Sequence, residues 1–192
     1  MTETDRIAEL QRRIEALDRE VTRQRDCEEI RQAMYAYARG VDRADAALFE
    51  AAFHDDAYDD HGNFRGDKAQ TVATLRRSGQ NPEVKASMHH IGNILIDLEG
   101  NFANVESYFV AYQRREVGDR TYTRSRAGRY LDRFEKRDGR WRVLRRRVVD
   151  DWSRLDEVGQ TAREVGPENT LCTRDRHDAS YEMEGFAQRH IG

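Results

Sequence analysis

The chain has 192 residues, of which 38% are hydrophobic and 36% are charged, with a formal net charge of −3. A charged share above the ~25% of an average globular protein indicates a long solvated helix or an oligomer. The slight acidic excess argues against a nucleic-acid binder. No stretch of the sequence is apolar enough to cross a membrane. Two distant cysteines, Cys27 and Cys172, form no CxxC pair, so we expect a reduced, cytoplasmic compartment.

The first expected element is a helix over residues 3–25. Its apolar side chains alternate at spacings of three and four residues, as the a and d positions of a coiled coil do: Ile7, Leu10, Ile14, Leu17 and Val21. Three heptads are only marginally stable alone, so this seam needs a partner. The partner is either the same helix of another subunit or the flank of the main domain. We expect a homo-oligomer, a trimer or a dimer.

Residues 26–156 are expected to form the main domain, with helices first and long strands afterwards. Asp26, Asp45 and Asp67 each stand before an apolar helical pattern, so each is expected to cap a helix. A short extended segment over residues 58–64 separates the second of these helices from the third.

Four long strands are expected after Pro82, over residues 87–98, 102–115, 121–136 and 140–152. The turn sequence Glu-Gly-Asn joins the first two strands into a hairpin, and Arg-Asp-Gly joins the last two. Helices followed by antiparallel strands predict an α+β domain in which a strongly curved sheet holds helices against its concave face. Residues 157–192 are polar and weakly patterned, and we expect an extended tail over the domain or over a neighbour.

The strand over 87–98 carries a candidate catalytic side chain. Side chains alternate between the faces of a strand, so His90 is expected on the apolar face with Ile94 and Ile96, while His89 falls on the other face. A buried imidazole needs hydrogen-bond partners, and a carboxylate would orient it and raise its basicity. The alternative is a core histidine with a purely structural role.

Asp42 is the second candidate, because it stands at the end of the first domain helix. A carboxylate there faces the unfavourable end of the helix dipole, so it needs a hydrogen-bond donor or marks a site. The alternative is a solvent-facing aspartate in a turn.

These segments resemble the SnoaL-like branch of the nuclear transport factor 2-like superfamily. GVDR at 40–43 and HHIGNILI at 89–96 are similar to the segments that hold the catalytic aspartate and histidine of a dehydrochlorinase in that branch. RDGRWRVLRR at 137–146 resembles its last hairpin, which places the active-site arginine at Arg146. The resemblance covers roughly residues 5–155 and implies a cone-shaped curved antiparallel sheet packed with helices.

The heptads followed by EEIRQAMYAYARGVD also resemble the bile-acid dehydratases of this branch, and scytalone dehydratase shares the plan. There a tyrosine five residues before the aspartate contacts substrate, and that position is Tyr37. Two positions depart from the pattern, because a later arginine corresponds to Asp150 and a pocket tyrosine falls near His61. The tail segment 174–181 has no counterpart, so the substrate does not carry over.

The resemblance implies a cofactor-independent lyase that performs a dehydratase-type elimination on a small cyclic or aromatic substrate. His90 would take the proton, and Asp42 would hold its imidazole in the right tautomer. Tyr37 would donate a hydrogen bond to a carbonyl or leaving oxygen. Arg146 would stabilise negative charge or pair with Asp42. No metal or organic cofactor is required, and the expected partner is a small molecule.

The segment HDDAYDDH at 54–61 admits three interpretations. Its histidines and aspartates would suit a metal site, a solvated acidic loop, or a pocket lined by Tyr58 or His61, which we take as substrate-binding candidates. The arginines of RWRVLRRR at 140–147 alternate between two faces of a strand, so they form no nucleic-acid stripe.

Two other functions fit the same pattern. One is a cofactorless C–C lyase that releases formaldehyde from lignin-derived aromatics by a retro-aldol step. The other is a non-catalytic small-molecule-binding module, because this fold hosts such proteins widely. The binding module predicts that Asp42 and His90 lie beyond hydrogen-bond reach.

Overall fold

A computed structural model describes residues 2–159, 166 and 168–183 of the chain. Helices and short strands come first: α1 (Glu3–Asp42), α2 (Ala46–Ala51), β1 (Phe53–Asp60), β2 (Arg65–Asp67) and α3 (Lys68–Gly79). Four long strands follow, and a short 3-10 helix lies in the tail: β3 (Val84–Glu99), β4 (Phe102–Val117), β5 (Arg120–Arg137), β6 (Arg140–Glu157) and η1 (Ala179–Tyr181).

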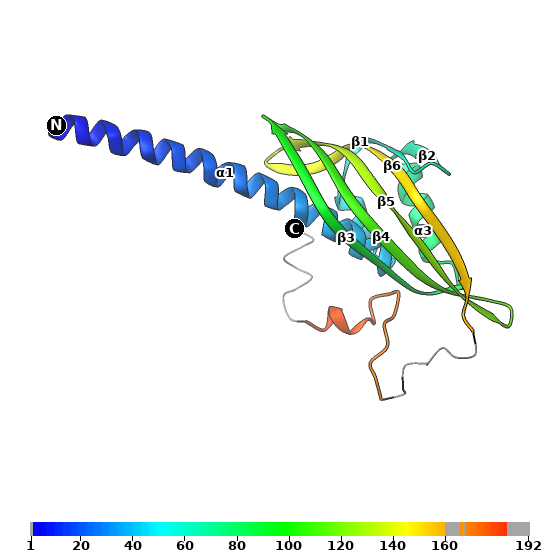
Figure 1. Ribbon diagram of the computed structural model, residues 1–192. Helices are drawn as coiled ribbons and strands as arrows, with labels where there is room; N and C mark the ends of the chain where they lie inside the picture. The colour runs from blue at the N-terminus through cyan, green and yellow to red at the C-terminus, as the bar shows by residue number, and fades with distance from the viewer. Residues whose placement is uncertain (1, 160–165, 167, 184–192) are drawn as a thin grey trace.

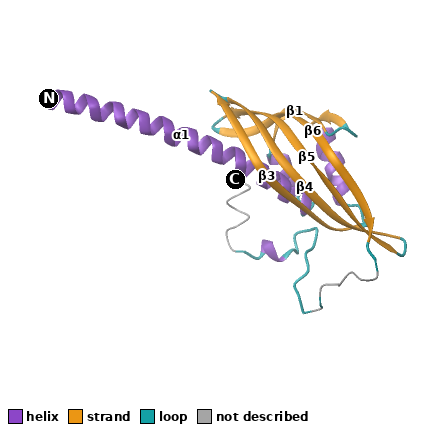
Figure 2. Ribbon diagram, viewed as in Figure 1, coloured by secondary structure: helices purple, strands orange, loops and turns teal. Residues whose placement is uncertain are grey.

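The strands form one six-stranded sheet in the order β2-β1-β6-β5-β4-β3. The sheet curves around α2, α3 and the second half of α1, as Figures 1 and 2 show. This confirms the expected α+β architecture and its two hairpins, whose turn glycines Gly100 and Gly139 have positive φ angles. One detail differs: β1 pairs with β6 in parallel, so the sheet is mixed rather than fully antiparallel.

Helix α1 is continuous across the position where a second helix was expected to begin. Asp26 therefore does not cap a helix; its carboxylate accepts hydrogen bonds from Trp141 Nε1 at 2.9 Å and Lys136 Nζ at 2.5 Å. No proline or glycine interrupts the chain there, so nothing ends the helix. The first half of α1 projects away from the domain (Figure 1).

The other two expected caps have different outcomes. Asp67 caps α3 and forms a capping box with Gln70, as the sequence predicts. Asp45 stands at the start of α2 but makes no capping hydrogen bond. Its carboxylate instead accepts a hydrogen bond from Tyr181 of the tail at 2.7 Å, so a long-range contact replaces the local one.

The core fills the concave side of the sheet near the β3–β4 and β5–β6 turns. Helix α1 and the strands contribute large side chains that are almost fully buried: Ile30, Met34, Tyr37, Phe53, Phe109, Tyr130, Phe134 and Val143. Polar groups also lie on this inner face: the fully buried Asp132–Arg146 pair lies within the core, and His89 and Arg126 lie further from these turns.

The described part of the tail folds back onto the end of α1. Arg43 pairs with Asp178 at 3.2 Å, and Arg39 donates a hydrogen bond to Ser180 Oγ at 3.1 Å. The remainder of the expected tail, residues 160–165, 167 and 184–192, lies outside the described residues. Within the described part of the chain, no helix is long and apolar enough to cross a bilayer.

Candidate active site

Asp42, the last residue of α1, holds an imidazole of the edge strand β3. Its Oδ1 lies 2.6 Å from Nδ1 of His89, and its Oδ2 accepts the backbone N–H of the same residue at 2.8 Å. Ser87 Oγ donates a third hydrogen bond at 3.0 Å. The side chains of Asp42 and His89 are nearly buried. A carboxylate held in this way fixes the tautomer and the orientation of its imidazole.

The partner of Asp42 is His89, so the predicted position of His90 is wrong. The pairing of β3 with β4 shifts register between Ile91 and Ile94. This irregularity reverses the alternation, so Ile94 shares its face with His89 and not with His90. His90 is exposed on the outer face, where its ring meets Tyr112 edge-on.

Asp42 is ionised at neutral pH. Burial by itself would raise the pKa of its carboxyl, but the hydrogen bonds from His89 and Ser87 outweigh burial and lower that pKa below its usual value. Within the described residues no hydrogen-bond partner is found for Nε2 of His89, so this nitrogen is available to a ligand.

A small cavity of about 310 Å³ lies beside this pair, between α1 and β3. It is lined by Tyr35, Ala38, Arg39, Asp42, Arg43, His89 and Ile91. The tail reaches the same place, because Arg174 Nε lies 3.4 Å from the backbone oxygen of Asp42.

A second carboxylate and imidazole pair lies at the end of β1. Asp59 Oδ1 is 2.8 Å from Nδ1 of His61, and His61 Nε2 is 3.5 Å from the hydroxyl of Tyr37. Burial raises the pKa of Tyr37 to about 12, so its hydroxyl stays protonated and remains a hydrogen-bond donor. The second carboxylate oxygen of Asp59 is buried and has no partner among the described residues.

Arg146 lies in the interior next to this second pair. It makes two hydrogen bonds of 2.8 Å to Asp132, so the expected alternative in which it pairs with Asp42 is wrong. Its guanidinium lies over the rings of Tyr37 and Tyr130 at 4.2 and 4.4 Å. Burial alone would lower its pKa, but Asp132 raises it above its usual value, so the charge persists. Its Nη1 has no partner among the described residues.

Arg126 is a group that the sequence reasoning missed. It lies opposite Ala111, which lies opposite His89, so all three share the inner face of the sheet. Strands are ~4.8 Å apart, which places the backbones of Arg126 and His89 roughly 10 Å from each other. Arg126 pairs with Asp150, and both line a cavity of about 370 Å³ that His61 also borders.

The structure therefore groups only some of the predicted site residues. It brings Tyr37, His61 and Arg146 together in the interior, and it places Asp42 with His89. Tyr58 is on the outer face, at a groove across the sheet. Asp59, Asp132 and Arg126 were missed; Asp59 stands in the acidic segment that was singled out, whereas no local signal marks Arg126.

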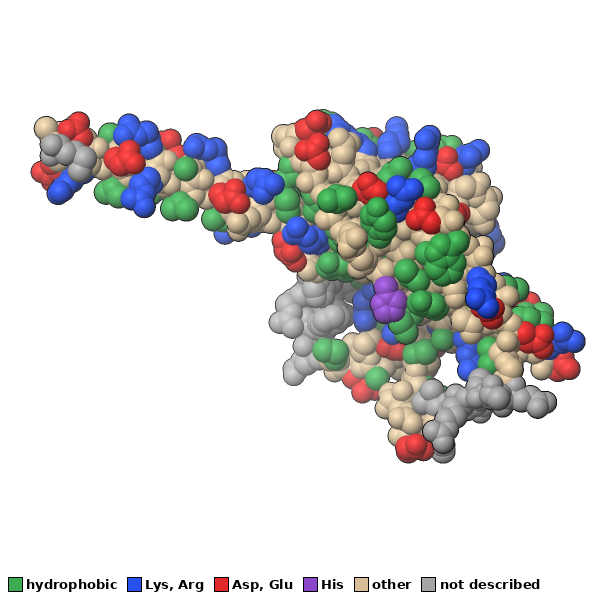
Figure 3. All heavy atoms as spheres, viewed as in Figure 1, with side chains coloured by type: hydrophobic (Ala, Val, Ile, Leu, Met, Phe, Trp, Pro, Cys, Tyr) green, Lys and Arg blue, Asp and Glu red, His purple; other side chains and the backbone are tan. Residues whose placement is uncertain are grey.

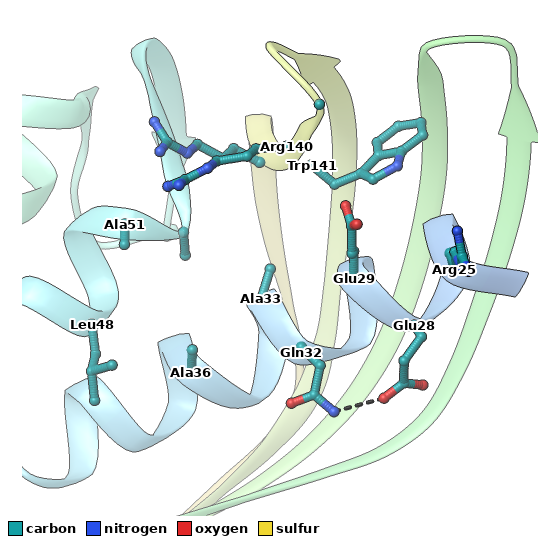
Figure 4. A pocket seen from close by; sticks show the side chains of 13 residues that line it. Arg25, Glu28, Glu29, Gln32, Ala33, Ala36, Leu48, Ala51, Arg140 and Trp141 are labelled. Atoms are coloured by element: carbon teal, nitrogen blue, oxygen red, sulfur yellow. Dashed lines mark hydrogen bonds between the residues drawn. The ribbon is translucent and has the colours of Figure 1, made fainter. Parts of the chain in front are cut away.

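A larger cavity of about 690 Å³ lies elsewhere, between α1, α2 and the start of β6 (Figure 4). Its walls carry Glu29, Arg140 and Trp141, and a hydrogen bond of 2.6 Å joins Gln32 to Glu28. None of the predicted site residues lines it. Among the described residues, no group of three or more histidine, cysteine or acidic side chains is arranged to hold a metal.

Comparison with known families places these residues in context. The sequence model of the SnoaL-like domain matches residues 22–147, a span that includes Tyr37, Asp42, His89 and Arg146. No relative is found among the curated proteins at the level of sequence.

Solved structures share the fold. A "Putative Scytalone Dehydratase" from Novosphingobium aromaticivorans is 23% identical with a TM-score of 0.60, covering 78% of this chain and 99% of its own. The hexachlorocyclohexane dehydrochlorinase LinA-type3 from Novosphingobium barchaimii is 18% identical with a TM-score of 0.61, covering 79% and 99%. The Kfla4162 protein from Kribbella flavida is 17% identical with a TM-score of 0.62, covering 68% and 94%.

Proposed function

Because this chain belongs to the SnoaL-like domain family, we propose that it is a cofactor-independent lyase that performs a dehydratase-type elimination on a small cyclic or aromatic substrate. The observation that carries the proposal is the nearly buried Asp42–His89 pair, whose two residues line a cavity. The similar structures include a protein titled as a dehydratase and a dehydrochlorinase, and both names denote elimination reactions.

His89 acts as the general base in this proposal. With Nδ1–H donated to Asp42, Nε2 carries the lone pair that accepts the substrate proton. Nε2 removes a proton from a carbon next to a carbonyl group, and the electron pair of that C–H bond becomes the new C=C bond. The hydroxyl group on the neighbouring carbon takes up a proton and leaves as water. Asp42 stabilises the imidazolium that forms, in a site with little water to screen the charge.

The leaving oxygen needs a proton donor. The imidazolium of His89 supplies that proton when the substrate is bound with both reacting carbons close to Nε2. The hydroxyl of Tyr37 is buried, contacts His61 and does not line the cavity beside His89, so His89 is the only proton donor that the proposal uses. Arg146 is fully buried against Asp132 and does not line the cavity beside His89, so in this proposal it takes no direct part in the elimination.

Neighbouring histidines on β3 provide the sharpest test. His89→Ala removes the proposed base, whereas His90→Ala removes an exposed histidine one residue away and serves as the matched control. We expect the first change to lower turnover by about 10²–10⁴-fold and the second to leave it nearly unchanged. The assay follows enone absorbance across a panel of small cyclic β-hydroxy ketones, and thermal unfolding confirms that both variants fold.

Equal activity of the two variants would remove His89 from the mechanism. Ligands that raise the melting temperature of the wild type without any turnover would instead identify a binding module. Release of formaldehyde from hydroxymethyl aromatics, measured in parallel, would identify the C–C lyase.

A further inference from the structure

The projecting half of α1 carries an apolar seam with no partner in the described chain. Its a and d side chains are between 43% and 64% exposed: Ile7, Leu10, Ile14, Leu17 and Val21. Figure 3 shows hydrophobic side chains along this projecting part of the helix. The expected alternative, a seam packed on the flank of the domain, is therefore wrong for this chain.

We propose that this seam pairs with the same helix of a second copy of the chain, in parallel and in register, as a two-stranded coiled coil. The residue types select this arrangement. The a positions hold the β-branched residues Ile7, Ile14 and Val21, and the d positions hold Leu10 and Leu17. β-Branched residues at a with leucine at d favour two parallel strands over three or four.

Charge complementarity supports the parallel orientation. In a parallel pair, a g residue of one helix faces the e residue five positions later in its partner. Arg13 then faces Asp18 of the second copy, and Glu20 faces Arg25. Both contacts join opposite charges, and two-fold symmetry repeats each of them.

The domain leaves room for this partner. The seam ends near Gln24, and the helix then turns a different face toward the domain, through Cys27, Ile30 and Met34. At 3.6 residues per turn the centres of these two faces differ by about 150°, roughly two fifths of a turn. The partner helix therefore lies on the side of α1 nearly opposite the face that contacts the domain, and the two domains of the dimer lie on opposite sides of the coiled coil.

Two substitutions on one helix turn test the seam itself. Leu17→Asp places a charge in the seam, whereas Arg19→Asp adds the same side chain at an outward f position. We expect the wild type and Arg19→Asp to sediment at twice the chain mass of 22.4 kDa, and Leu17→Asp to sediment as a monomer. Thermal unfolding of the domain reports whether each variant folds. A monomeric wild type, a trimer, or an oligomer that survives Leu17→Asp would overturn the proposal.

Charge reversal tests the orientation. Arg13→Glu and Asp18→Arg should each weaken the dimer by placing like charges opposite each other, and the double variant should restore it. In a chain whose exposed Cys172 is changed to serine, oxidation of Leu10→Cys should link two copies within the seam. The outward Arg19→Cys should not. Failure of the double variant to recover, or equal cross-linking of both cysteines, would exclude the parallel dimer. None of these measurements depends on the proposed lyase activity.

Discussion

At the scale of single residues, Asp42 links stability to pH. Its carboxyl pKa is lowered in the folded state, because hydrogen bonds from His89 and Ser87 outweigh burial. A lowered carboxyl pKa stabilises the folded state above the unfolded pKa of ~3.9, and this contribution disappears as the pH falls through the folded value.

We therefore expect Asp42→Asn to lower the free energy of unfolding by about 1–3 kcal/mol at pH 7. The difference from the wild type should shrink below pH ~4, where the aspartate itself becomes neutral. Urea unfolding at several pH values between 3 and 7 measures it. A difference that stays constant over this range would mean that the charge of Asp42 does not stabilise the fold.

The histidines of β3 show how far single residues can be predicted. Sequence patterns located Asp42 and the segment that holds its partner, but strict alternation selected His90. The irregular pairing between Ile91 and Ile94 reverses which side chains face inward on the two sides of it. Gly92, a glycine inside a strand, is only a weak sequence signal for such an irregularity. Only the pairing with β4 settles which imidazole faces inward. Arg126 was missed for a related reason, since its position opposite His89 depends on two strand pairings.

At the scale of elements, the Arg146–Asp132 pair joins β5, β6 and α1. Both side chains are fully buried, and the guanidinium also contacts Tyr37 of α1. Removing one member of such a pair leaves an uncompensated charge in the core, whereas apolar replacement of both members is far better tolerated.

We expect Asp132→Asn to lower the free energy of unfolding by about 3–5 kcal/mol. The double variant Arg146→Met with Asp132→Leu should recover most of this loss. The exposed pair of Arg133 and Glu99 is the control, and Glu99→Gln should cost less than about 1 kcal/mol. Urea unfolding followed by circular dichroism compares the variants. Equal effects of Asp132→Asn and Glu99→Gln would show that the buried pair has no special role.

The elements themselves were largely predictable, because local chemistry determines them. Asp67 and Gln70 form the expected capping box, and glycines occupy the expected hairpin turns. The errors occurred where distant groups compete with local ones. Asp26 and Asp45 have the side chain of a helix cap, but Trp141 and Tyr181 from other parts of the chain occupy their carboxylates.

At the scale of the whole molecule, the tail closes over the ends of two helices. Arg174 Nε lies 3.4 Å from the last carbonyl of α1, and its Nη1 lies 3.3 Å from the carbonyl of Gly79 at the end of α3. A cation at helix C-termini satisfies free carbonyls and the negative end of each dipole. Because the first of these carbonyls belongs to Asp42, we expect the tail to support the backbone that carries the carboxylate of the proposed active site.

A comparison of Arg174 with Arg176 tests whether the contacts of Arg174 with the two helix ends contribute more than an ordinary surface ion pair. Arg174→Ala should lower the free energy of unfolding by about 1–2 kcal/mol, because two helix ends lose a charged donor. It should also reduce turnover through looser placement of Asp42. Arg176 is the matched control, because its side chain is 60% exposed while it pairs with Asp45. Arg176→Ala should cost less than about 1 kcal/mol and leave turnover unchanged. If urea unfolding and turnover do not distinguish the two variants, the tail does not support the end of α1, and Asp42 depends on its contacts with β3 alone.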